Sequence, residues 1–220
     1  MVFDSGIGGT TVLEHIKQSI PNAQYSYFMD NALLPYGAQS QQTIINRLCS
    51  LIHFIKANTL NVDLIVIACN TASTSALSAV RQITDIPIVG VVPAIKPAAE
   101  LTRSNHIGLL ATPATVASSY TKTLIAEHAR NVIVNLYSSV ELVTLAEECF
   151  FTGSLDTNKL YQVLDELHID KTIDVLVLGC THFPILAKAI GIFYQGRVST
   201  IDSGAAIAKR VKSIVQTQTK

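Results

Sequence analysis

One pattern occurs twice in this chain, as Asp63-Leu-Ile-Val-Ile-Ala-Cys69-Asn-Thr71 and as Asp174-Val-Leu-Val-Leu-Gly-Cys180-Thr-His182. Each copy begins with an aspartate, continues through an apolar run, and ends in a small residue followed by a cysteine. The interval between the two aspartates equals the interval between the two cysteines. An unbroken apolar run is typical of a central strand in a parallel sheet, because both of its faces are covered. The repeat predicts a duplicated α/β unit with a thiol at the end of one strand in each half.

The rest of the chain alternates between short apolar runs and stretches with helical spacing. The runs predict further strands at residues 25–29, 86–91, 107–111, 132–137 and 198–201. Helices are expected at residues 9–19 and 40–57, after Cys69 with Ser73 as the cap, from the Thr112 turn to about residue 128, and from residue 204 onward. Strands that alternate with helices favour parallel sheets.

The sequence therefore predicts an α/β protein of two pseudo-symmetric domains, each a mainly parallel sheet flanked by helices. The active site is expected in the cleft between the domains. We assign residues 1–94, with a returning C-terminal helix at 204–220, to the first domain, which carries Cys69. Residues 95–203 form the second domain, which carries Cys180.

Composition narrows the class of protein. Of 220 residues, 49% are hydrophobic and 15% are charged, so much of the chain must be buried in a compact body. Sixteen basic residues balance sixteen acidic ones, which argues against nucleic acid or a membrane surface as a partner. No apolar run is long enough to span a bilayer, and no signal region opens the chain. We expect a soluble, cytoplasmic protein.

The four cysteines are far apart in the sequence and form no C-x-x-C pair, which argues against a zinc ribbon or a thioredoxin-type site. No metal is expected. Cys49 lies beside the apolar face of its predicted helix and is interpreted as a core thiol, and Cys149 as packing. Cys69 and Cys180 differ, because each is predicted at the carboxyl end of a strand and next to a helix N-terminus, where a thiolate is stabilised.

Two thiols with polar neighbours suggest a particular chemistry. The alternative is that both cysteines merely fill strand–helix junctions, but Cys69 precedes Asn70-Thr71 and Cys180 precedes Thr181-His182. Opposed thiols suit racemisation next to a carboxylate, in which one thiolate removes a proton and the other thiol supplies one to the opposite face. The ends of parallel strands also bring Asp4 and Thr112 to this edge. The site must supply donors for the carbanion-like charge.

Six motifs, in order along the chain, resemble the glutamate racemase family. They are Asp4-Ser-Gly-Ile-Gly-Gly, Pro35-Tyr-Gly, Ala68-Cys-Asn-Thr-Ala-Ser, Gly90-Val-Val-Pro-Ala-Ile-Lys-Pro-Ala, Gly179-Cys-Thr-His-Phe-Pro and Asp202-Ser-Gly. The stretch from Ser139 to Glu147 is most similar to the proteobacterial branch. The resemblance implies interconversion of L- and D-glutamate without a cofactor, to supply D-glutamate for peptidoglycan.

The resemblance also implies residue roles. It makes Cys69 the base toward D-glutamate and Cys180 the base toward L-glutamate, assisted by Asp4 and His182 respectively. Glu147 matches an acidic position of the family's site, although its acidic neighbours leave an exposed helix carboxylate as the competing interpretation. Residues implied to hold the substrate are Ser5, Tyr36, Gly37, Asn70, Thr71, Thr112, Thr115 and Thr181.

Other interpretations stay open at this point. The same chemistry could act on aspartate or another amino acid. Cys180 with His182 could instead serve a cysteine hydrolase or transferase, or the chain could be a non-catalytic binding protein, since some members of the family bind DNA gyrase. A homodimer is possible. Compared with the family, both ends are short, from which we expect reduced stability and no activation through an N-terminal extension.

Overall fold

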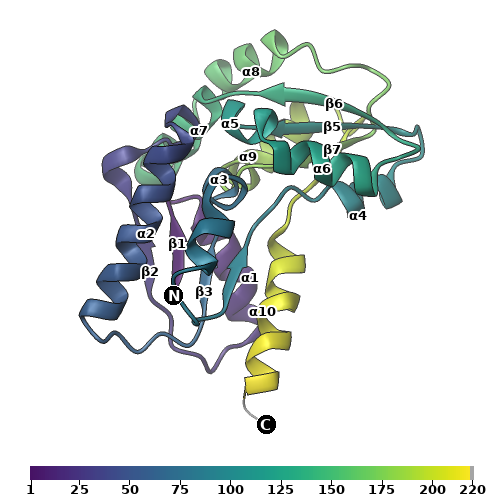
Figure 1. Ribbon diagram of the computed structural model, residues 1–220. Helices are drawn as coiled ribbons and strands as arrows, with labels where there is room; N and C mark the ends of the chain where they lie inside the picture. The colour runs from purple at the N-terminus through teal and green to yellow at the C-terminus, as the bar shows by residue number, and fades with distance from the viewer. Residues whose placement is uncertain (219–220) are drawn as a thin grey trace.

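The computed structural model describes residues 1–218 and has two lobes, each built on a four-stranded sheet (Figure 1). The strand order is β2-β1-β3-β4 in the first lobe and β6-β5-β7-β8 in the second, and all the pairings are parallel. The second sheet therefore repeats the order of the first, which confirms the predicted α/β fold of two pseudo-symmetric halves with helices around each sheet.

In the first lobe the strands are β1 (Val2–Asp4), β2 (Tyr27–Met29), β3 (Ile65–Ile67) and β4 (Ile88–Gly90). Its helices are α1 (Gly9–Ser19), α2 (Gln41–Ala57), α3 (Asn70–Arg81) and α10 (Gly204–Gln218), with 3₁₀ turns η1 (Asn31–Leu33) and η2 (Tyr36–Ala38). The C-terminal α10 returns to this lobe and packs against α1 (Figure 1).

In the second lobe the strands are β5 (His106–Ala111), β6 (Ile133–Ser138), β7 (Val175–Leu178) and β8 (Ser199–Ile201). Its helices are α4 (Ile95–Leu101), α5 (Pro113–Ala117), α6 (Ser119–His128), α7 (Glu141–Thr152), α8 (Thr157–Glu166) and α9 (Phe183–Phe193). No helix within residues 1–218 is both long and apolar enough to cross a membrane.

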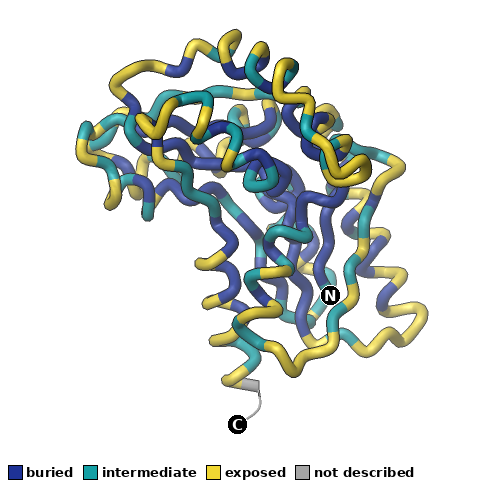
Figure 2. The backbone as a smooth tube through the Cα atoms, turned by 180° about the vertical axis from the view of Figure 1, so that it is seen from behind, coloured by how far each residue is buried: buried dark blue, intermediate teal, exposed yellow. Residues whose placement is uncertain are grey.

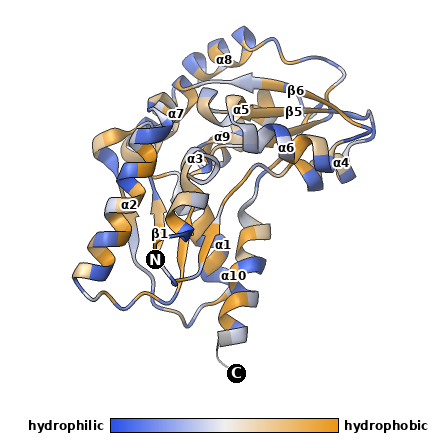
Figure 3. Ribbon diagram, in the orientation of Figure 1, coloured by the Kyte–Doolittle hydropathy of each residue, from blue (hydrophilic) through white to orange (hydrophobic). Residues whose placement is uncertain are grey.

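Each sheet is covered on both faces, as the apolar strands require. Successive side chains of a strand point to opposite faces, so Phe3 and Ile65 pack with α2 and α3, whereas Val2 and Val66 pack with α1 and α10. The second sheet is covered by α7, α8 and α9 on one face and by α4 and α6 on the other. Buried backbone follows the central strands β1, β3, β5 and β7 (Figure 2), and β3 and β5 are among the strongly hydrophobic segments (Figure 3).

Two local predictions are wrong. The N-cap of α3 is Cys69, whose sulfur accepts the Ala72 N–H, and not Ser73. Ser73 lies inside the helix, where its hydroxyl donates to the Ile67 carbonyl and accepts the Val91 N–H, so it ties α3 to β3 and to the end of β4. The helix expected from the Thr112 turn is also two helices, because Ser118 is extended and caps α6.

The chain crosses between the lobes twice, once between β4 and α4 and once between β8 and α10. The two crossings touch, because the Ser203 hydroxyl donates to the Val92 carbonyl at 2.5 Å. We propose these crossings as the domain boundaries, which gives 1–94 with 204–220 and, between them, 95–203. Residues 219 and 220 of that division lie outside the described residues.

Candidate active site

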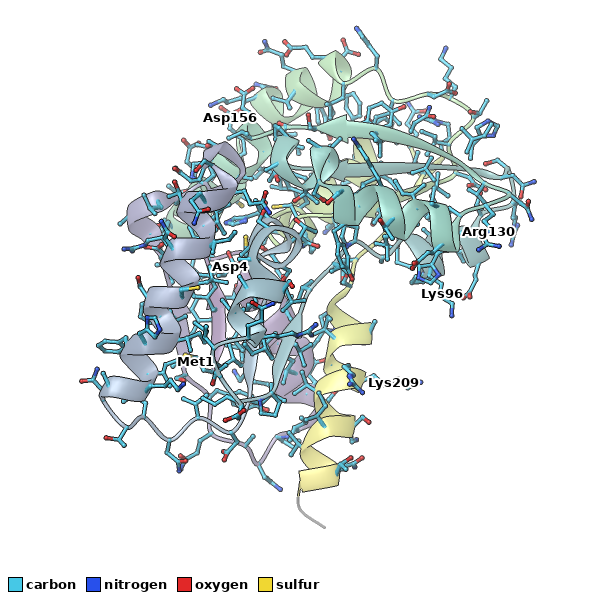
Figure 4. The ribbon with its side chains drawn as sticks, in the orientation of Figure 1. Met1, Asp4, Lys96, Arg130, Asp156 and Lys209 are labelled. Atoms are coloured by element: carbon cyan, nitrogen blue, oxygen red, sulfur yellow. The ribbon has the colours of Figure 1, made fainter. Side chains whose placement is uncertain are left out.

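Cys69 and Cys180 occupy equivalent places in the two lobes. Each lies two residues after the end of a central strand, β3 or β7; Cys69 directly precedes α3, whereas Thr181 and His182 separate Cys180 from α9. Both are buried, with 6% and 7% of their surface exposed. Figure 4 places Asp4 at the centre of the molecule, where the lobes meet, whereas Lys209 and Asp156 lie on the outside. A cavity of about 10 Å³, lined in part by Asn70, Cys180 and Ser203, opens at the same junction.

The surroundings of Cys69 keep its proton in place. Burial is the main cause that raises the pKa of the Cys69 thiol well above its ordinary range, and the negative charge of Asp4 raises it further. The contact with Asp4 is indirect, because Ser5 lies between them. The Ser5 hydroxyl is 3.8 Å from the Cys69 sulfur and donates to Asp4 Oδ1 at 3.5 Å. The structure therefore presents Cys69 as a neutral thiol beside a polar relay.

Asp4 joins the two lobes. Its Oδ1 accepts the Gly6 N–H at 3.0 Å and its Oδ2 accepts the Thr181 hydroxyl, from the second lobe, at 3.0 Å. Complete burial raises the pKa of the Asp4 carboxyl, although the charge of His182 and both hydrogen bonds act against this shift. The pKa of the Asp4 carboxyl therefore lies above its ordinary value.

His182 pairs the second thiol with a carboxylate. Its Nδ1 lies 3.7 Å from the Cys180 sulfur, and its Nε2 lies 2.6 Å from Glu147 Oε1. Since a carboxylate only accepts, Nε2 carries a proton and donates it to Glu147. Burial alone would lower the pKa of His182, but its contacts with Cys180 and Glu147 outweigh burial and raise it to about 10. The ring is an imidazolium that faces the sulfur.

Glu147 is part of this site and is not an exposed helix carboxylate. Only 8% of its surface is exposed, and its Oε1 accepts both His182 Nε2–H and the Ile7 N–H, the latter at 2.9 Å. Burial raises the pKa of Glu147, but the hydrogen bonds from His182 and Ile7 outweigh burial, so the pKa lies below its usual range. Glu147 on α7 thus links the glycine-rich turn of the first lobe to His182.

Three threonines gather at the junction as a cluster of hydroxyls. Thr71 Oγ1 is 2.8 Å from Thr112 Oγ1 and 3.2 Å from Thr115 Oγ1, and Thr112 donates to Thr115 at 3.1 Å. Gly37 lies against this cluster, since a Cβ at Gly37 would be 2.6 Å from the Thr112 Cβ. The backbone can approach the hydroxyls here only because this residue is glycine. Such a cluster can donate to an anion or accept from a cation.

The Tyr36 hydroxyl is bonded to Asp30, so it is not the group through which Tyr36 would hold a ligand. The side chain is buried, and its hydroxyl donates to Asp30 Oδ2 at 2.7 Å. Arg47 on α2 donates to both oxygens of Asp30. Tyr36 therefore contributes the backbone of its turn to the site, while Asp30 and Arg47 hold that turn in place. Sequence reasoning missed both residues, because no motif links Asp30 to Arg47.

The other expected substrate-holding residues, Ser5, Asn70 and Thr181, are all buried at the junction. Asn70 Oδ1 is a buried acceptor that receives no hydrogen bond from the described residues, which fits a ligand that carries N–H groups. Tyr27 also reaches the site unpredicted. Its hydroxyl donates to the Gly6 carbonyl at 2.6 Å, and burial raises its pKa above the usual range, so the phenol stays a donor.

Two thiols at matching strand ends, with unlike proton-holding partners, define a racemase-type site on this fold. The family model described as Asp/Glu/Hydantoin racemase matches residues 9–211, and the chain belongs to this family. This confirms the resemblance inferred from the motifs.

Relatives within the family are similar over most of their length. A glutamate racemase of Shewanella sp. (strain MR-7) is 49% identical over 215 residues, which are 98% of this chain and 78% of the relative. The crystal structure of Escherichia coli glutamate racemase in complex with L-glutamate and the activator UDP-MurNAc-Ala has a TM-score of 0.91 at 40% identity, over 98% of this chain and 82% of that one. Glutamate racemase from Francisella tularensis in complex with D-glutamate has a TM-score of 0.81 at 33% identity, over 99% and 80%.

Proposed function

We propose that this chain is a glutamate racemase that interconverts L- and D-glutamate by proton transfer at the α-carbon between Cys69 and Cys180. The observation that carries this proposal is the placement of two buried thiols at equivalent strand ends in a duplicated fold, each with its own proton-holding group. Glutamate racemases that are similar to this chain support the proposal, and two of them have solved structures with glutamate bound.

The two thiols have complementary protonation in this scheme. The His182 imidazolium is positioned to stabilise a thiolate on Cys180, while burial and Asp4 keep Cys69 as a thiol. Cys180 then takes the α-proton of L-glutamate, and Cys69 gives its proton to the opposite face, which yields D-glutamate. The reverse reaction starts with the two roles exchanged. Because both acid and base come from the chain, the proposed reaction uses no cofactor.

Proton removal needs help, since the α-proton of an amino acid is far less acidic than a thiol. The N-terminus of α3 presents backbone N–H groups and partial positive charge at the Cys69 junction. We propose that Ser5, Asn70, Thr71, Thr112, Thr115, Thr181 and the Tyr36–Gly37 backbone hold the substrate's carboxylates and ammonium. Donors fixed in advance around developing charge supply the largest share of such catalysis.

Deuterium incorporation tests the function directly. In D₂O the protein should place deuterium at the α-carbon of either enantiomer of glutamate, followed by NMR, and circular dichroism should show the solution racemise. Cys69→Ser and Cys180→Ser should each abolish turnover, because both faces need a proton carrier. Cys49→Ser and Cys149→Ser are the matched controls and should retain it. Absence of exchange with both enantiomers would sink the proposal.

The first alternative concerns the identity of the substrate. Aspartate or another amino acid could undergo the same chemistry at the same thiols. Exchange measured side by side with glutamate and aspartate discriminates the two, and a higher kcat/KM for aspartate would replace glutamate as the proposed substrate.

One geometric observation favours a second candidate, a cysteine hydrolase or transferase. Cys180, His182 and Glu147 are arranged as nucleophile, base and orienting carboxylate. That function needs Cys180 but not Cys69, and it forms a covalent acyl-enzyme. Mass spectrometry after incubation with an activated ester would show the adduct, and retained activity in Cys69→Ser would favour this candidate over racemisation.

The cellular setting follows from the proposed product. D-glutamate is a component of peptidoglycan, whose precursors are made in the cytoplasm, and we place the enzyme there. The four cysteines are free thiols, which suits a reducing compartment. We also propose a homodimer, because edge strand β6 exposes Ile133 and Leu136, and a second copy could cover them. Sedimentation of the protein and of Leu136→Lys tests this.

A further inference from the structure

One peptide group in the glycine-rich turn is held at both ends. The carbonyl of Gly6 accepts the Tyr27 hydroxyl at 2.6 Å. The N–H of Ile7, which belongs to the same peptide plane, donates to Glu147 Oε1 at 2.9 Å. Since a peptide group is planar and rigid, a constraint on its oxygen also fixes the direction of its N–H. Tyr27 in the first lobe therefore orients a donor that points at the second lobe.

The line of hydrogen bonds continues from Glu147 to a thiol. The Oε1 atom that accepts the Ile7 N–H also accepts His182 Nε2–H at 2.6 Å, and His182 Nδ1 faces the Cys180 sulfur at 3.7 Å. Because Ile7 and His182 donate to the same oxygen, the link between them is positional: the Ile7 N–H fixes where Oε1 lies, and Oε1 fixes the His182 ring. A change at the Gly6 carbonyl is thus transmitted through Glu147 and His182 to Cys180.

The other thiol is less tightly linked to Tyr27. The Gly6 N–H donates to Asp4 Oδ1, but this N–H belongs to the preceding peptide plane. Two rotatable backbone bonds of Gly6 separate that plane from the carbonyl which Tyr27 holds, and glycine is the residue least restricted about them. Through hydrogen bonds, the Tyr27 hydroxyl is therefore coupled rigidly to the Cys180 side and loosely to the Cys69 side.

The tyrosine reaches this carbonyl through a space left open by glycine. A Cβ on Gly9 would lie 2.7 Å from the Tyr27 hydroxyl and 2.7 Å from the Asp4 Cβ. The tyrosine also lies on β2, paired directly with β1, where Val2 is the partner of Tyr27. The strand pairing thus fixes the position of the Tyr27 hydroxyl, and the absence of a side chain at Gly9 leaves room for it.

We propose that Tyr27 is a positioning residue for proton transfer at Cys180, acting through the Gly6–Ile7 peptide, Glu147 and His182. The proposal rests on the two-thiol racemisation proposed above. Without the hydroxyl the peptide plane loses its anchor, the Ile7 N–H turns away from Glu147, and the His182 ring is held less firmly against the sulfur. The free energy of the transition state for proton transfer between L-glutamate and Cys180 rises, while that for proton transfer at Cys69 changes little.

The test compares Tyr27→Phe with Tyr25→Phe. Tyr25 is a matched control, because its hydroxyl also donates to a backbone carbonyl at 2.6 Å, that of Ile20 at the far end of α1. We expect Tyr27→Phe to lower kcat/KM about fivefold, within the range that loss of one buried hydrogen bond allows. The fall must be equal for the two enantiomers, since their free energies are equal. Tyr25→Phe should stay within twofold of the wild type.

Isotope effects distinguish positioning at one thiol from general loosening. If the Cys180 step becomes more rate-limiting, the α-deuterium effect on kcat/KM should increase with labelled L-glutamate, whose deuterium is removed in that step. It should decrease with labelled D-glutamate, whose deuterium is removed in the other step. Equal changes for both enantiomers, or none, would overturn the proposal.

A second variant guards against misfolding of the first. Site-specific Tyr27→3-fluorotyrosine keeps the ring and makes the hydroxyl a stronger donor, so the two isotope effects should shift in the opposite directions. If both isotope effects in the 3-fluorotyrosine variant equal those of the wild type, the proposal is overturned, even if Tyr27→Phe does not fold. Failure of the wild type to racemise glutamate at all would reject the function itself, whereas symmetric isotope effects in an active enzyme reject only the role of Tyr27.

Discussion

Replacement of Gly6 by alanine should break the link between the lobes at Glu147. A Cβ at Gly6 would lie 2.9 Å from His182 Nε2 and 2.9 Å from Leu34 Cδ1, and closest of all to Glu147 Oε1. That oxygen accepts from both His182 and Ile7, so its displacement breaks two hydrogen bonds to a buried carboxylate. Breaking a buried, paired charge costs about 3–5 kcal/mol of unfolding free energy, which is a large part of the roughly 5–15 kcal/mol that a domain has.

The assay is thermal unfolding together with racemase kinetics. For a chain of this size we expect Gly6→Ala to lower the unfolding midpoint by about 10 °C and to lower kcat about 100-fold, as a displacement of catalytic groups by roughly 1 Å does. Gly191→Ala on α9 is the matched control. Its Cβ would meet nothing within 4 Å, and alanine inside a helix should stabilise by about 0.5–1 kcal/mol. Wild-type stability and activity in Gly6→Ala would refute the reasoning.

Three further predictions concern other parts of the structure. Arg47→Ala leaves the buried Asp30 with Tyr36 as its side-chain donor. We expect the free energy of unfolding, measured by chemical denaturation, to fall by about 1–3 kcal/mol, and KM to rise at nearly constant kcat. An unchanged KM would contradict the role of the Tyr36–Gly37 turn in holding the substrate. The pKa of His182 rises to about 10 from an ordinary 6.5, so the stability that its protonation contributes is complete below pH 6.5 and is lost as pH rises through 10. The difference in thermal unfolding midpoint between wild type and His182→Gln should therefore shrink between pH 6.5 and pH 10. A constant difference would argue against the raised pKa. Ser73→Ala removes two hydrogen bonds of the hydroxyl, but the Val91 N–H still donates to the Ile67 carbonyl, so neither backbone group loses its last partner. The free energy of unfolding should therefore fall by only about 1 kcal/mol, and a loss above about 3 kcal/mol would contradict this.

Much of the fold was predictable because the central strands β3 and β7 are apolar throughout and the pattern repeats. Four consecutive buried residues form β7, and β3 is buried along its whole length. The break at Ser118 was not predictable, since no proline or glycine marks it. A serine can either continue a helix or cap the next one, and its side-chain bond to the Thr121 N–H selects the cap.

The site was predictable to the extent that parallel strands end at one edge. That rule predicts Cys69, Cys180 and Asp4 together before any contact is known. It says nothing of hydrogen-bond direction, which depends on groups brought together only by the folded chain. Glu147 and the neighbouring Glu148 have the same chemistry, but Glu147 lies on the buried face of α7, where His182 and the Ile7 N–H donate to it.

The contact between the two chain crossings limits how the halves of the molecule can move. The Ser203–Val92 hydrogen bond holds the two crossing segments side by side, so they define a single line about which the halves could rotate. Swinging about that axis needs only small changes in backbone torsion, whereas sliding or twisting of the halves would pull the two segments apart and break the bond. A swing of the halves about this line would leave the Ser203–Val92 bond intact, whereas it would have to break the bonds from Thr181 to Asp4 and from Ile7 to Glu147 that join the halves at the thiols.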